Sequence, residues 1–411
     1  MKGVEMVHHR HPAVVLDLSA NGIGIIRSLA RKGITIYGFD VERKYKLGKT
    51  RYATCSACPD PAEDGEQLLA FLLEKRKLFT TRPVLYAGSD EFVTFISTYR
   101  KQLEVEFLFL FPEHELIEAV LDKRKTAELA QRYQIPSPKS FMIYDDNDLQ
   151  EAVKELTFPC ILKPVRGHEF RKKLSEKAIV MENEEQLLSE YEIYRQFGEL
   201  FIQEIIPGAE QCIYQVGTFF NDEMDLIGLF MGQKLNQFPP YFGAGARVLS
   251  VVDEEVLKAG TKLLRMLNFK GLAVVEFKRD PRDNKLKFIE INARTWLWHS
   301  LSGRCQVDLS YLYYLSLTDQ NPIPRLKQIE GIEWIYLVRD FLSTYEKRKK
   351  RDASFISWFR GLFRKKEHAL LSIYDPFPFI RITISHLANA WRNKRRAYKR
   401  HIEQEKTKDE H

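Results

Sequence analysis

The chain has 411 residues, of which 44% are hydrophobic and 29% charged; this is enough for two or three domains with hydrophobic cores and excludes an intrinsically disordered protein. Its first residues lack the pattern of a secretory signal, and its apolar runs are far shorter than the roughly 20 residues of a membrane-spanning helix, so we expect a cytoplasmic protein. The net charge of +7 is concentrated near the C-terminus, because residues 341–411 hold 18 Lys and Arg against 8 Asp and Glu.

The N-terminal residues show the pattern of a βαβ unit. Residues 13–18 are an apolar strand candidate, followed by a Gly-containing turn, a helix that ends at Gly33 and a second strand that ends at Asp40. The stretches PVLYAGSDE and FLFLF add two more apolar strands. We therefore expect residues 1–115 to form a Rossmann-like domain with an open, mostly parallel sheet.

The turn after the first strand contains Gly22 and Gly24 but not the full GxGxxG pattern of dinucleotide-binding proteins. The pattern therefore gives little support to a nicotinamide-dependent oxidoreductase, since a tight turn explains both glycines. Another interpretation is that the helix N-terminus near Asn21 binds a substrate carboxylate.

Helices and short strands alternate from residue 121 to about residue 267. LDKRKTAELAQRYQIPSP predicts a helix that ends before Pro136, and FPCILKP predicts a strand. KAIVMENEEQLLSEYEIY predicts a strand and a helix, and LFIQEIIPG a strand that ends in a turn. A strand-rich stretch follows to about residue 250, and residues 253–267 predict the next helix.

The stretch LAVVEFKRDPRDNKLKFIEIN predicts a β-hairpin with its turn centred on Asp283. Antiparallel pairing about this centre places Glu276 opposite Glu290. Two carboxylates at such positions repel each other, and burial strengthens the repulsion. We therefore expect another group to neutralise them.

The second strand of this hairpin alternates polar and apolar residues, so its two faces differ. One face carries Glu290, Asn292 and Arg294. The other, which we expect to face the core, carries Ile289, Ile291 and Ala293.

A divalent cation would neutralise Glu276 and Glu290, with Asn292 as a further oxygen ligand. Mg²⁺ completes its shell with water and substrate phosphates, so such a site implies a nucleotide. The alternative is a solvated sheet face on which Lys278 and Arg294 neutralise the two acids.

These motifs, with lysines earlier in the chain, resemble those of an ATP-grasp ligase over residues 116–320. The resemblance implies an α/β protein whose ATP-grasp part is α+β and has two lobes, a small lobe at residues 116–205 and a catalytic lobe at residues 206–330. Residues 331–411 would form a basic, amphipathic helical tail. Within the superfamily, YAGSDE and PPYFGAGARV resemble the carboxylate-amine ligases of the D-aspartate ligase-like group.

The resemblance also implies roles for individual residues. Lys123, with Lys125 as a competitor, and Lys163 match the two ATP-binding lysines. The hinge IQEIIPGAE implies adenine contacts from Glu204 and from the backbone of Ile205 and Ile206, and a ribose contact from Glu210. The magnesium strands imply Glu276, Glu290 and Asn292 as metal ligands and Arg294 as a phosphate-facing catalytic cation.

The loop VRGHEFRKKLSEK departs from the family pattern, because it has one glycine where the family usually has several. Its charged residues are therefore expected to grip phosphate, and Lys177 is our candidate; an ordinary solvated charge run is the alternative. Lys234 is a further phosphate-binding candidate. Arg247, beside Gly243 and Gly245, is a candidate clamp for the substrate carboxylate, although surface charge explains both cations equally well.

The five cysteines have no regular spacing, which argues against a disulfide framework and agrees with a reducing compartment. The CxxC at Cys55 and Cys58 lacks a second pair, so we expect no metal site there. Cys160, Cys212 and Cys305 have apolar neighbours and are expected in the core, not as nucleophiles. Core packing is also expected for a second set of residues, namely Trp296, Trp298 and His299.

The segment FISWFRGLFRKK has an apolar helical stripe with basic flanks. The stripe comprises Phe355, Trp358, Phe359, Leu362 and Phe363. Such a helix suits an anionic membrane surface, and the alternative is a helix docked on the protein body. Nucleic acid is not expected, since no recognition motif accompanies the charge.

The resemblance to ATP-grasp ligases implies an ATP- and Mg²⁺-dependent (or Mn²⁺-dependent) ligase that activates a carboxylate as an acyl phosphate and joins it to an amine, on an amino acid or a cell-envelope precursor. Its expected partners are the two small substrates, with a homodimer and the inner face of the membrane as further candidates. The competing hypothesis is a non-catalytic, nucleotide-binding scaffold on the same fold.

Overall fold

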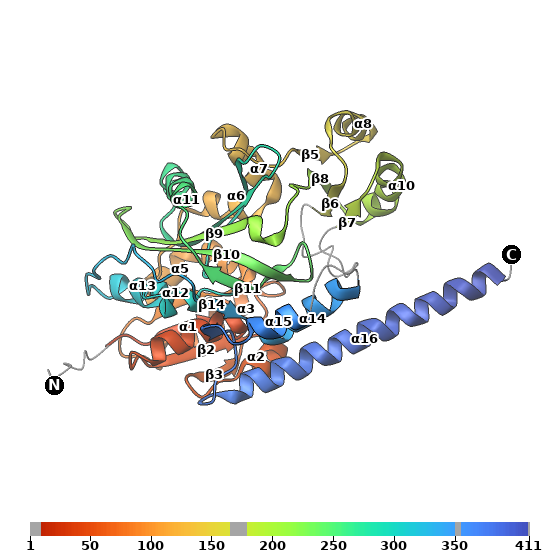
Figure 1. The fold of residues 1–411 in the computed structure, drawn as a ribbon. Coiled ribbons are helices and arrows are strands. Elements are labelled where there is room, and N and C mark those ends of the chain that lie inside the picture. Colours follow the sequence, from red (N-terminus) through yellow and green to blue (C-terminus); the bar gives the residue numbers. More distant parts are fainter. Residues whose placement is uncertain (1–9, 165–178, 350–354, 410–411) are drawn as a thin grey trace.

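The computed structural model describes residues 10–164, 179–349 and 355–409. Its elements form three β-sheets surrounded by helices, with the N-terminal domain at one end of the molecule and a small lobe at the other (Figure 1). The last helix runs along the body and extends beyond it.

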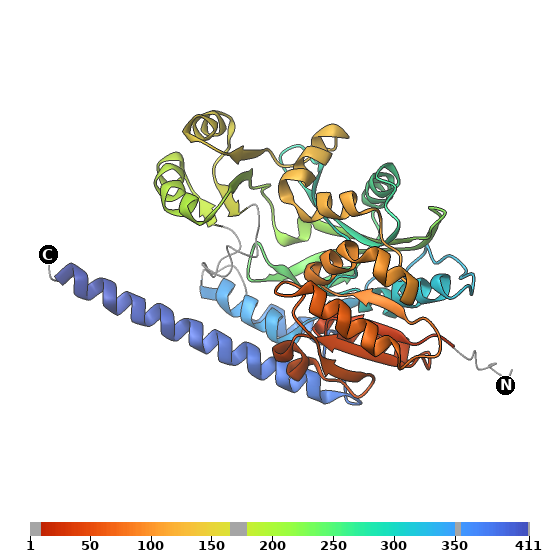
Figure 2. The same ribbon diagram turned by 180° about the vertical axis from the view of Figure 1, so that it is seen from behind.

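The N-terminal domain contains the predicted parallel sheet, with strands in the order β3-β2-β1-β4. The strands are β1 (Ala13–Leu16), β2 (Ile36–Asp40), β3 (Thr54–Ala57) and β4 (Val84–Ala87). The helices are α1 (Ala20–Ala30), α2 (Glu42–Gly48), α3 (Gly65–Arg76), α4 (Asp90–Thr98) and α5 (Arg100–Glu106). The prediction of a further strand at FLFLF is wrong, because only Leu108 bridges to Val84 there. The helices on this domain are seen best from behind (Figure 2).

Two helices, α6 (His114–Leu121) and α7 (Lys123–Arg132), lead into the small lobe. Its sheet is antiparallel, with strands in the order β5-β8-β6-β7. Its elements are β5 (Ser140–Ile143), α8 (Asp146–Glu155), β6 (Cys160–Pro164), β7 (Ile179–Met181), α10 (Glu184–Tyr194) and β8 (Leu200–Glu204). This lobe has its own hydrophobic core, separate from the rest of the protein. The predicted loop residue Lys177 lies outside the described residues.

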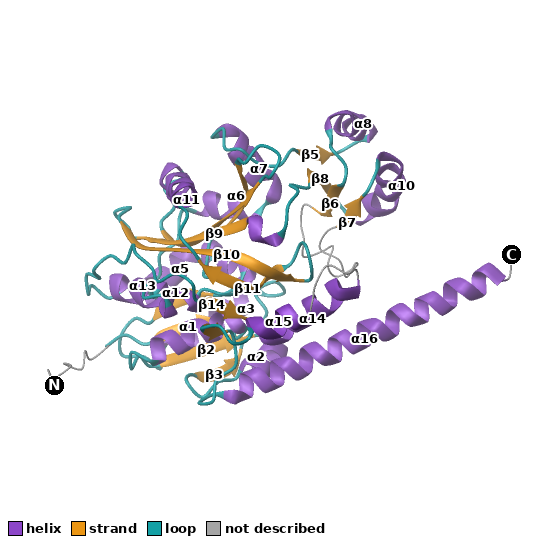
Figure 3. Ribbon diagram, in the orientation of Figure 1, coloured by secondary structure: helices purple, strands orange, loops and turns teal. Residues whose placement is uncertain are grey.

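The central sheet has seven strands in the order β13-β12-β9-β10-β11-β14-β15. Strands are orange and helices purple in Figure 3. The strands are β9 (Ile213–Phe220), β10 (Leu226–Phe238), β11 (Ala244–Ser250), β12 (Gly271–Arg279), β13 (Leu286–Asn292), β14 (Glu333–Ile335) and β15 (Lys366–His368). The helices after β11 are α11 (Glu254–Met266), α12 (Ser300–Arg304), α13 (Leu309–Leu317), α14 (Leu337–Lys349), α15 (Phe355–Gly361) and α16 (Pro376–Asp409). Residues after 331 therefore contribute two strands as well as helices. A continuous core joins this sheet to the N-terminal domain.

The predicted hairpin is formed by β12 and β13, and its register places Glu276 opposite Glu290 as expected. A β-bulge follows, because Phe277 pairs with Phe288 and leaves Ile289 as an extra residue. The expectation that Ile289 faces the core is therefore wrong: it is partly exposed and lines a cavity. Ile291 and Ala293 are buried, as predicted.

The residues of the predicted apolar stripe in the C-terminal segment differ in their exposure to solvent. Trp358 is partly buried and donates a hydrogen bond to Asp340 Oδ2 (2.6 Å), whereas Phe359 and Phe363 are exposed. The docked alternative thus applies to Trp358. No helix in the described ranges has the length and apolar character needed to cross a bilayer.

Candidate functional site

A cavity of 440 Å³ lies where the small lobe, the β12–β13 hairpin and the N-terminal domain meet. It brings together ten of the residues singled out in the sequence. They are Lys123, Lys163, Glu204, Ile205, Ile206, Lys234, Glu276, Glu290, Asn292 and Arg294. Residues from sequence positions as far apart as 123 and 294 therefore line the same cavity.

The two opposed glutamates have different surroundings. Glu276 is buried, and its Oε2 lies 2.8 Å from Lys234 Nζ and accepts a hydrogen bond from Gln215 Nε2. Burial raises the pKa of Glu276, although Lys234 acts in the opposite direction. Glu290 is exposed and accepts from Asn292 Nδ2 (3.0 Å). Lys234 is thus the direct ion-pair partner of Glu276.

The two cations that neutralise this pair in the alternative of a solvated sheet face are engaged elsewhere. Lys278 Nζ donates to the carbonyl oxygen of Ile206 (2.7 Å), and Arg294 Nε donates to Asp90 Oδ1 (2.6 Å). Burial disfavours the charged form of Arg294, but Asp90 and Glu290 raise its pKa above the usual value. Arg294 therefore stays cationic beside the cavity.

The structure separates the two candidates for the first lysine. Lys125 pairs with Glu118 (3.0 Å) outside the cavity, whereas Lys123 lines it. Lys163 Nζ donates to Gln203 Oε1 (3.0 Å). Burial and the positive charge of Lys123 lower the pKa of Lys163 to about 8.

The hairpin acids fit a hard cation bound together with phosphate. Glu276, Glu290 and Asn292 supply carboxylate and amide oxygens from adjacent strands, which is the donor chemistry of Mg²⁺. No cluster of three or more His, Cys, Asp or Glu suited to a metal occurs in the described ranges. An ion here would therefore depend on Asn292, water and ligand oxygens to complete its shell.

The hinge strand is fixed by its neighbours. Glu204 Oε2 accepts from the backbone N–H of Lys139 (3.1 Å), and Glu204 Oε1 pairs with Arg282 (2.6 Å). The carbonyl oxygen of Ile206 accepts a hydrogen bond from Lys278. Side chains of the β12–β13 hairpin therefore position the residues between β8 and β9.

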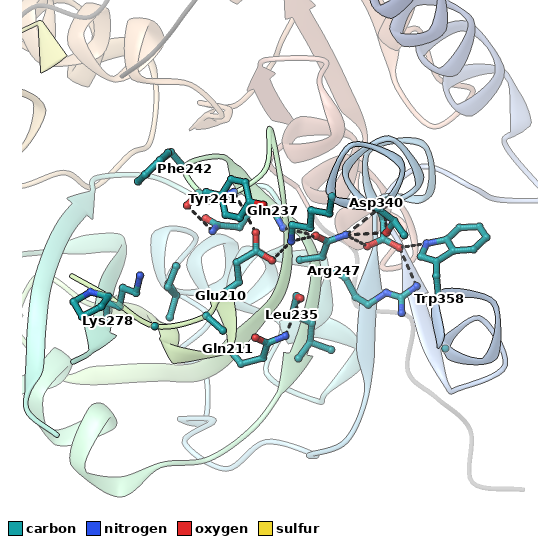
Figure 4. Close-up of a pocket in the computed structure, with 18 of the residues that line it drawn as sticks. Glu210, Gln211, Leu235, Gln237, Tyr241, Phe242, Arg247, Lys278, Asp340 and Trp358 are labelled. Carbon is teal, nitrogen blue, oxygen red and sulfur yellow. Dashed lines mark hydrogen bonds and ion pairs between the residues drawn. The ribbon is translucent and has the colours of Figure 1, made fainter. Parts of the chain in front are cut away.

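Two predicted residues, Arg247 and Glu210, lie outside this cavity and line an adjoining cavity of 1480 Å³ (Figure 4). Arg247 pairs with the buried Asp340 (2.9 Å). The guanidinium that was predicted to bind a substrate carboxylate thus binds a carboxylate of the protein itself. Glu210 accepts from Tyr241 N (3.3 Å) and pairs with Lys347.

Sequence reasoning missed three side chains that contact the predicted residues. Gln215 and Gln203 bond to Glu276 and Lys163, and Asp90 bonds to Arg294. Gln203 and Asp90 lie within the motifs IQEIIPG and YAGSDE, which was the available signal, whereas Gln215 had none.

Other predictions concern residues near the site. Asn21 donates to the carbonyl oxygens of Gly88 (2.7 Å) and Thr295 (3.0 Å), so its side-chain amide links the N-terminal domain to the strand end that carries Arg294. Trp296 and Trp298 are buried as expected, but they also line the cavity.

All five cysteines are free thiols. Cys160 and Cys305 are buried as expected, whereas Cys212 is partly exposed.

No family model matches the chain. Over 240 residues it is 25% identical to D-aspartate ligase of Enterococcus faecium (strain Aus0004), a match that covers 56% of this chain and 57% of that protein. The chain thus spans little more than half the length of this curated relative.

Several solved structures share the fold. L-amino acid ligase from Bacillus licheniformis superposes with a TM-score of 0.57 at 16% identity, covering 77% of this chain and 78% of that one. The ADP complex of N5-carboxyaminoimidazole ribonucleotide synthetase has a TM-score of 0.63 at 12% identity, with 83% and 85% covered. The biotin carboxylase domain dimer of Hydrogenobacter thermophilus 2-oxoglutarate carboxylase, a complex with magnesium ADP and bicarbonate, has a TM-score of 0.61 at 16% identity, with 79% and 73% covered. The chain therefore has the ATP-grasp fold of these ligases and is a distant homologue of D-aspartate ligase.

Proposed function

We propose that the protein is an ATP- and Mg²⁺-dependent ligase that activates a carboxylate as an acyl phosphate and joins it to an amine. One observation carries this proposal: Lys123, Lys163 and Arg294 line the same cavity as the opposed glutamates Glu276 and Glu290. Cations and metal-ligating acids are both needed in one space to hold a triphosphate and its metal ion.

The residues would divide the work by their chemistry. Lys123 and Lys163 would act as point charges on phosphate oxygens, and Arg294 as a planar fork. Glu276, Glu290 and Asn292 would hold Mg²⁺, which would supply positive charge to offset that of the transferred phosphoryl group.

Arg294 also indicates where the carboxylate would bind. Its Nε is occupied by Asp90 of the N-terminal domain, while its guanidinium faces the cavity that holds Asn292 (Nη2 to Oδ1, 3.4 Å). The carboxylate would therefore be activated at the junction of the N-terminal domain and the hairpin, where Asp90 orients the guanidinium.

ADP release tests this proposal. The full chain is incubated with ATP, Mg²⁺ and a panel of amino acids and related carboxylates, with hydroxylamine present to trap an acyl phosphate as a hydroxamate. The proposal expects ADP and hydroxamate with at least one carboxylate and neither product from the Arg294→Gln variant.

The competing function is a non-catalytic nucleotide-binding scaffold. Tight ATP binding with no ADP release across a broad panel would favour it. A nicotinamide-dependent oxidoreductase would instead require NAD(P) binding by the N-terminal domain, which isothermal titration calorimetry can measure.

Membrane attachment through the C-terminal segment stays a prediction. Trp358 of the apolar stripe is docked on Asp340, which removes one anchor from the surface that was expected to meet lipid.

A further inference from the structure

A third cavity, of 160 Å³, lies among α1, α12, the N-terminus of α13 and β15. It shares no lining residue with either cavity of the candidate site. Helices α1 and α12, which both contribute lining residues, lie side by side (Figure 1). One water needs roughly 10–15 Å³, so the cavity admits a molecule of several heavy atoms, but it is smaller than the roughly 300 Å³ at which drug-sized pockets begin.

Three residues that line the cavity each have a buried side-chain nitrogen without a hydrogen-bond partner among the described residues: Arg27 Nε, His299 Nε2 and His368 Nδ1. Arg27 is 8% exposed and His299 2%. Buried polar groups are normally hydrogen-bonded, so three such atoms on one small cavity indicate a polar occupant.

The chemistry of two of these atoms can be assigned. His299 Nδ1 lies 2.9 Å from the carbonyl oxygen of Trp296, which can only accept, so Nδ1 donates. Burial lowers the pKa of His299 to about 4, which keeps the ring neutral and leaves Nε2 as an acceptor. Arg27 pairs with Asp375 (3.1 Å) through Nη2, which leaves its Nε–H as a donor.

The charges around the cavity are mixed. Arg31 and Glu367 both line it, and within the described part of the chain neither has an ion-pair partner. They are therefore opposite charges with space between them. Asp308 adds a carboxylate that accepts from Ser28 Oγ (2.6 Å), and Lys32 lies over the ring of Tyr311.

This balance selects the class of ligand. A phosphate would face the carboxylates of Glu367 and Asp308, and a metal cation would face Arg27 and Arg31. A zwitterion satisfies both sets: an ammonium group suits Glu367 and the His299 acceptor, and a carboxylate suits Arg31 and the Arg27 donor.

We propose that this cavity, between Arg31 and Glu367, binds a free α-amino acid at a site separate from the catalytic cavity. The inference goes beyond the proposed function and does not depend on turnover. The segment that follows Arg294 joins the two sites, because Trp296 lines the catalytic cavity and its carbonyl oxygen orients the His299 ring.

Isothermal titration calorimetry of the full chain, without ATP, tests the proposal with glycine, the common L-amino acids, D-alanine and D-aspartate as probes. At least one of them is expected to bind at least tenfold more weakly to both Arg31→Gln and Glu367→Gln. The charge-matched controls Lys262→Gln and Glu254→Gln, at exposed positions on α11, should bind as the parent does.

The variant Arg294→Gln separates this site from the catalytic one, since Arg294 lines the catalytic cavity and does not line this one. The proposal is overturned if no amino acid loses affinity in both cavity variants, or if the affinity is lost in Arg294→Gln instead. Should Glu367→Gln fail to fold, crystals of the parent soaked in the tightest probe decide the question: amino-acid density between Arg31 and Glu367 supports the site, and ordered water alone refutes it.

Discussion

The charge of Lys163 should make nucleotide affinity fall at alkaline pH. Burial and the nearby Lys123 lower the pKa of Lys163 to about 8, while Glu290 and Glu276 oppose the shift. A bound triphosphate favours the protonated lysine, so binding above pH 8 takes up a proton. The dissociation constant for Mg²⁺–ATP is therefore expected to rise with pH.

The size of the effect follows from this pKa. Uptake of one proton weakens binding by about tenfold per pH unit, which gives about thirtyfold between pH 7 and pH 9.5. Stability of the nucleotide-free protein should change in the opposite direction. Lys163 has an ordinary value of 10.5, so the unfolded state binds more protons between pH 8 and pH 10.5 and the lysine destabilises the fold less as pH rises through this window.

Calorimetric titrations with a non-hydrolysable ATP analogue at pH 7, 8, 9 and 9.5 measure the effect. Lys163→Arg should remove most of the pH dependence, because arginine stays charged throughout. Lys125→Arg, outside the cavity, should retain it. A parent protein whose affinity is constant across this range would show that Lys163 does not contact the triphosphate or is not shifted.

Two further predictions concern the β12–β13 hairpin and the ion pair between α14 and β11. Glu290→Gln should reduce ADP release by at least tenfold, whereas Glu254→Gln on α11 should not; equal turnover by the Glu290 variant would contradict the proposed metal site. Asp340→Ala leaves Arg247 buried without its partner and should lower the free energy of unfolding by about 3–5 kcal/mol in urea titrations. The double variant Asp340→Leu/Arg247→Met should recover much of this loss, and a loss equal to that of the single variant would show that the ion pair is not its cause.

The β12–β13 hairpin is the part of the candidate site that the sequence specifies most completely. The alternation of polar and apolar residues and the short turn predict a hairpin in which the two glutamates meet. The pairs next to the turn, Lys278–Lys287 and Arg279–Leu286, are centred between Arg282 and Asp283, not on Asp283, and alone would place Glu276 opposite Ile289. The β-bulge at Ile289 shifts the pairing by one residue and brings Glu290 opposite Glu276. Its sequence signal is the change of phase of the apolar positions between Phe288 and Ile289.

Partners that come from distant elements could not be predicted in the same way. Lys234 pairs with Glu276 across 42 positions, and Asp90 meets Arg294 across 204. Each lysine or acid had many possible partners in the chain, and only the packing of the sheet against the N-terminal domain selects one. Sequence spacing identifies which groups carry charge, whereas tertiary structure decides how those charges are divided between structural pairs and ligand contacts.

The C-terminal segment shows the same distinction for apolar residues. Helical periodicity correctly indicates that one face of this segment is apolar, but it does not indicate what covers that face. In the structure Trp358 packs inward and donates to Asp340, whose carboxylate also holds Arg247, while Lys347 from the preceding helix pairs with Glu210 on the adjoining cavity wall. The first of these contacts lies within the segment, between Trp358 and Asp340. The other two join Asp340 and Lys347 to Arg247 and Glu210, which lie before position 331. The segment therefore belongs to the same folded unit as the candidate site. Its basic charge is then a property of that unit's surface and does not by itself define a membrane anchor.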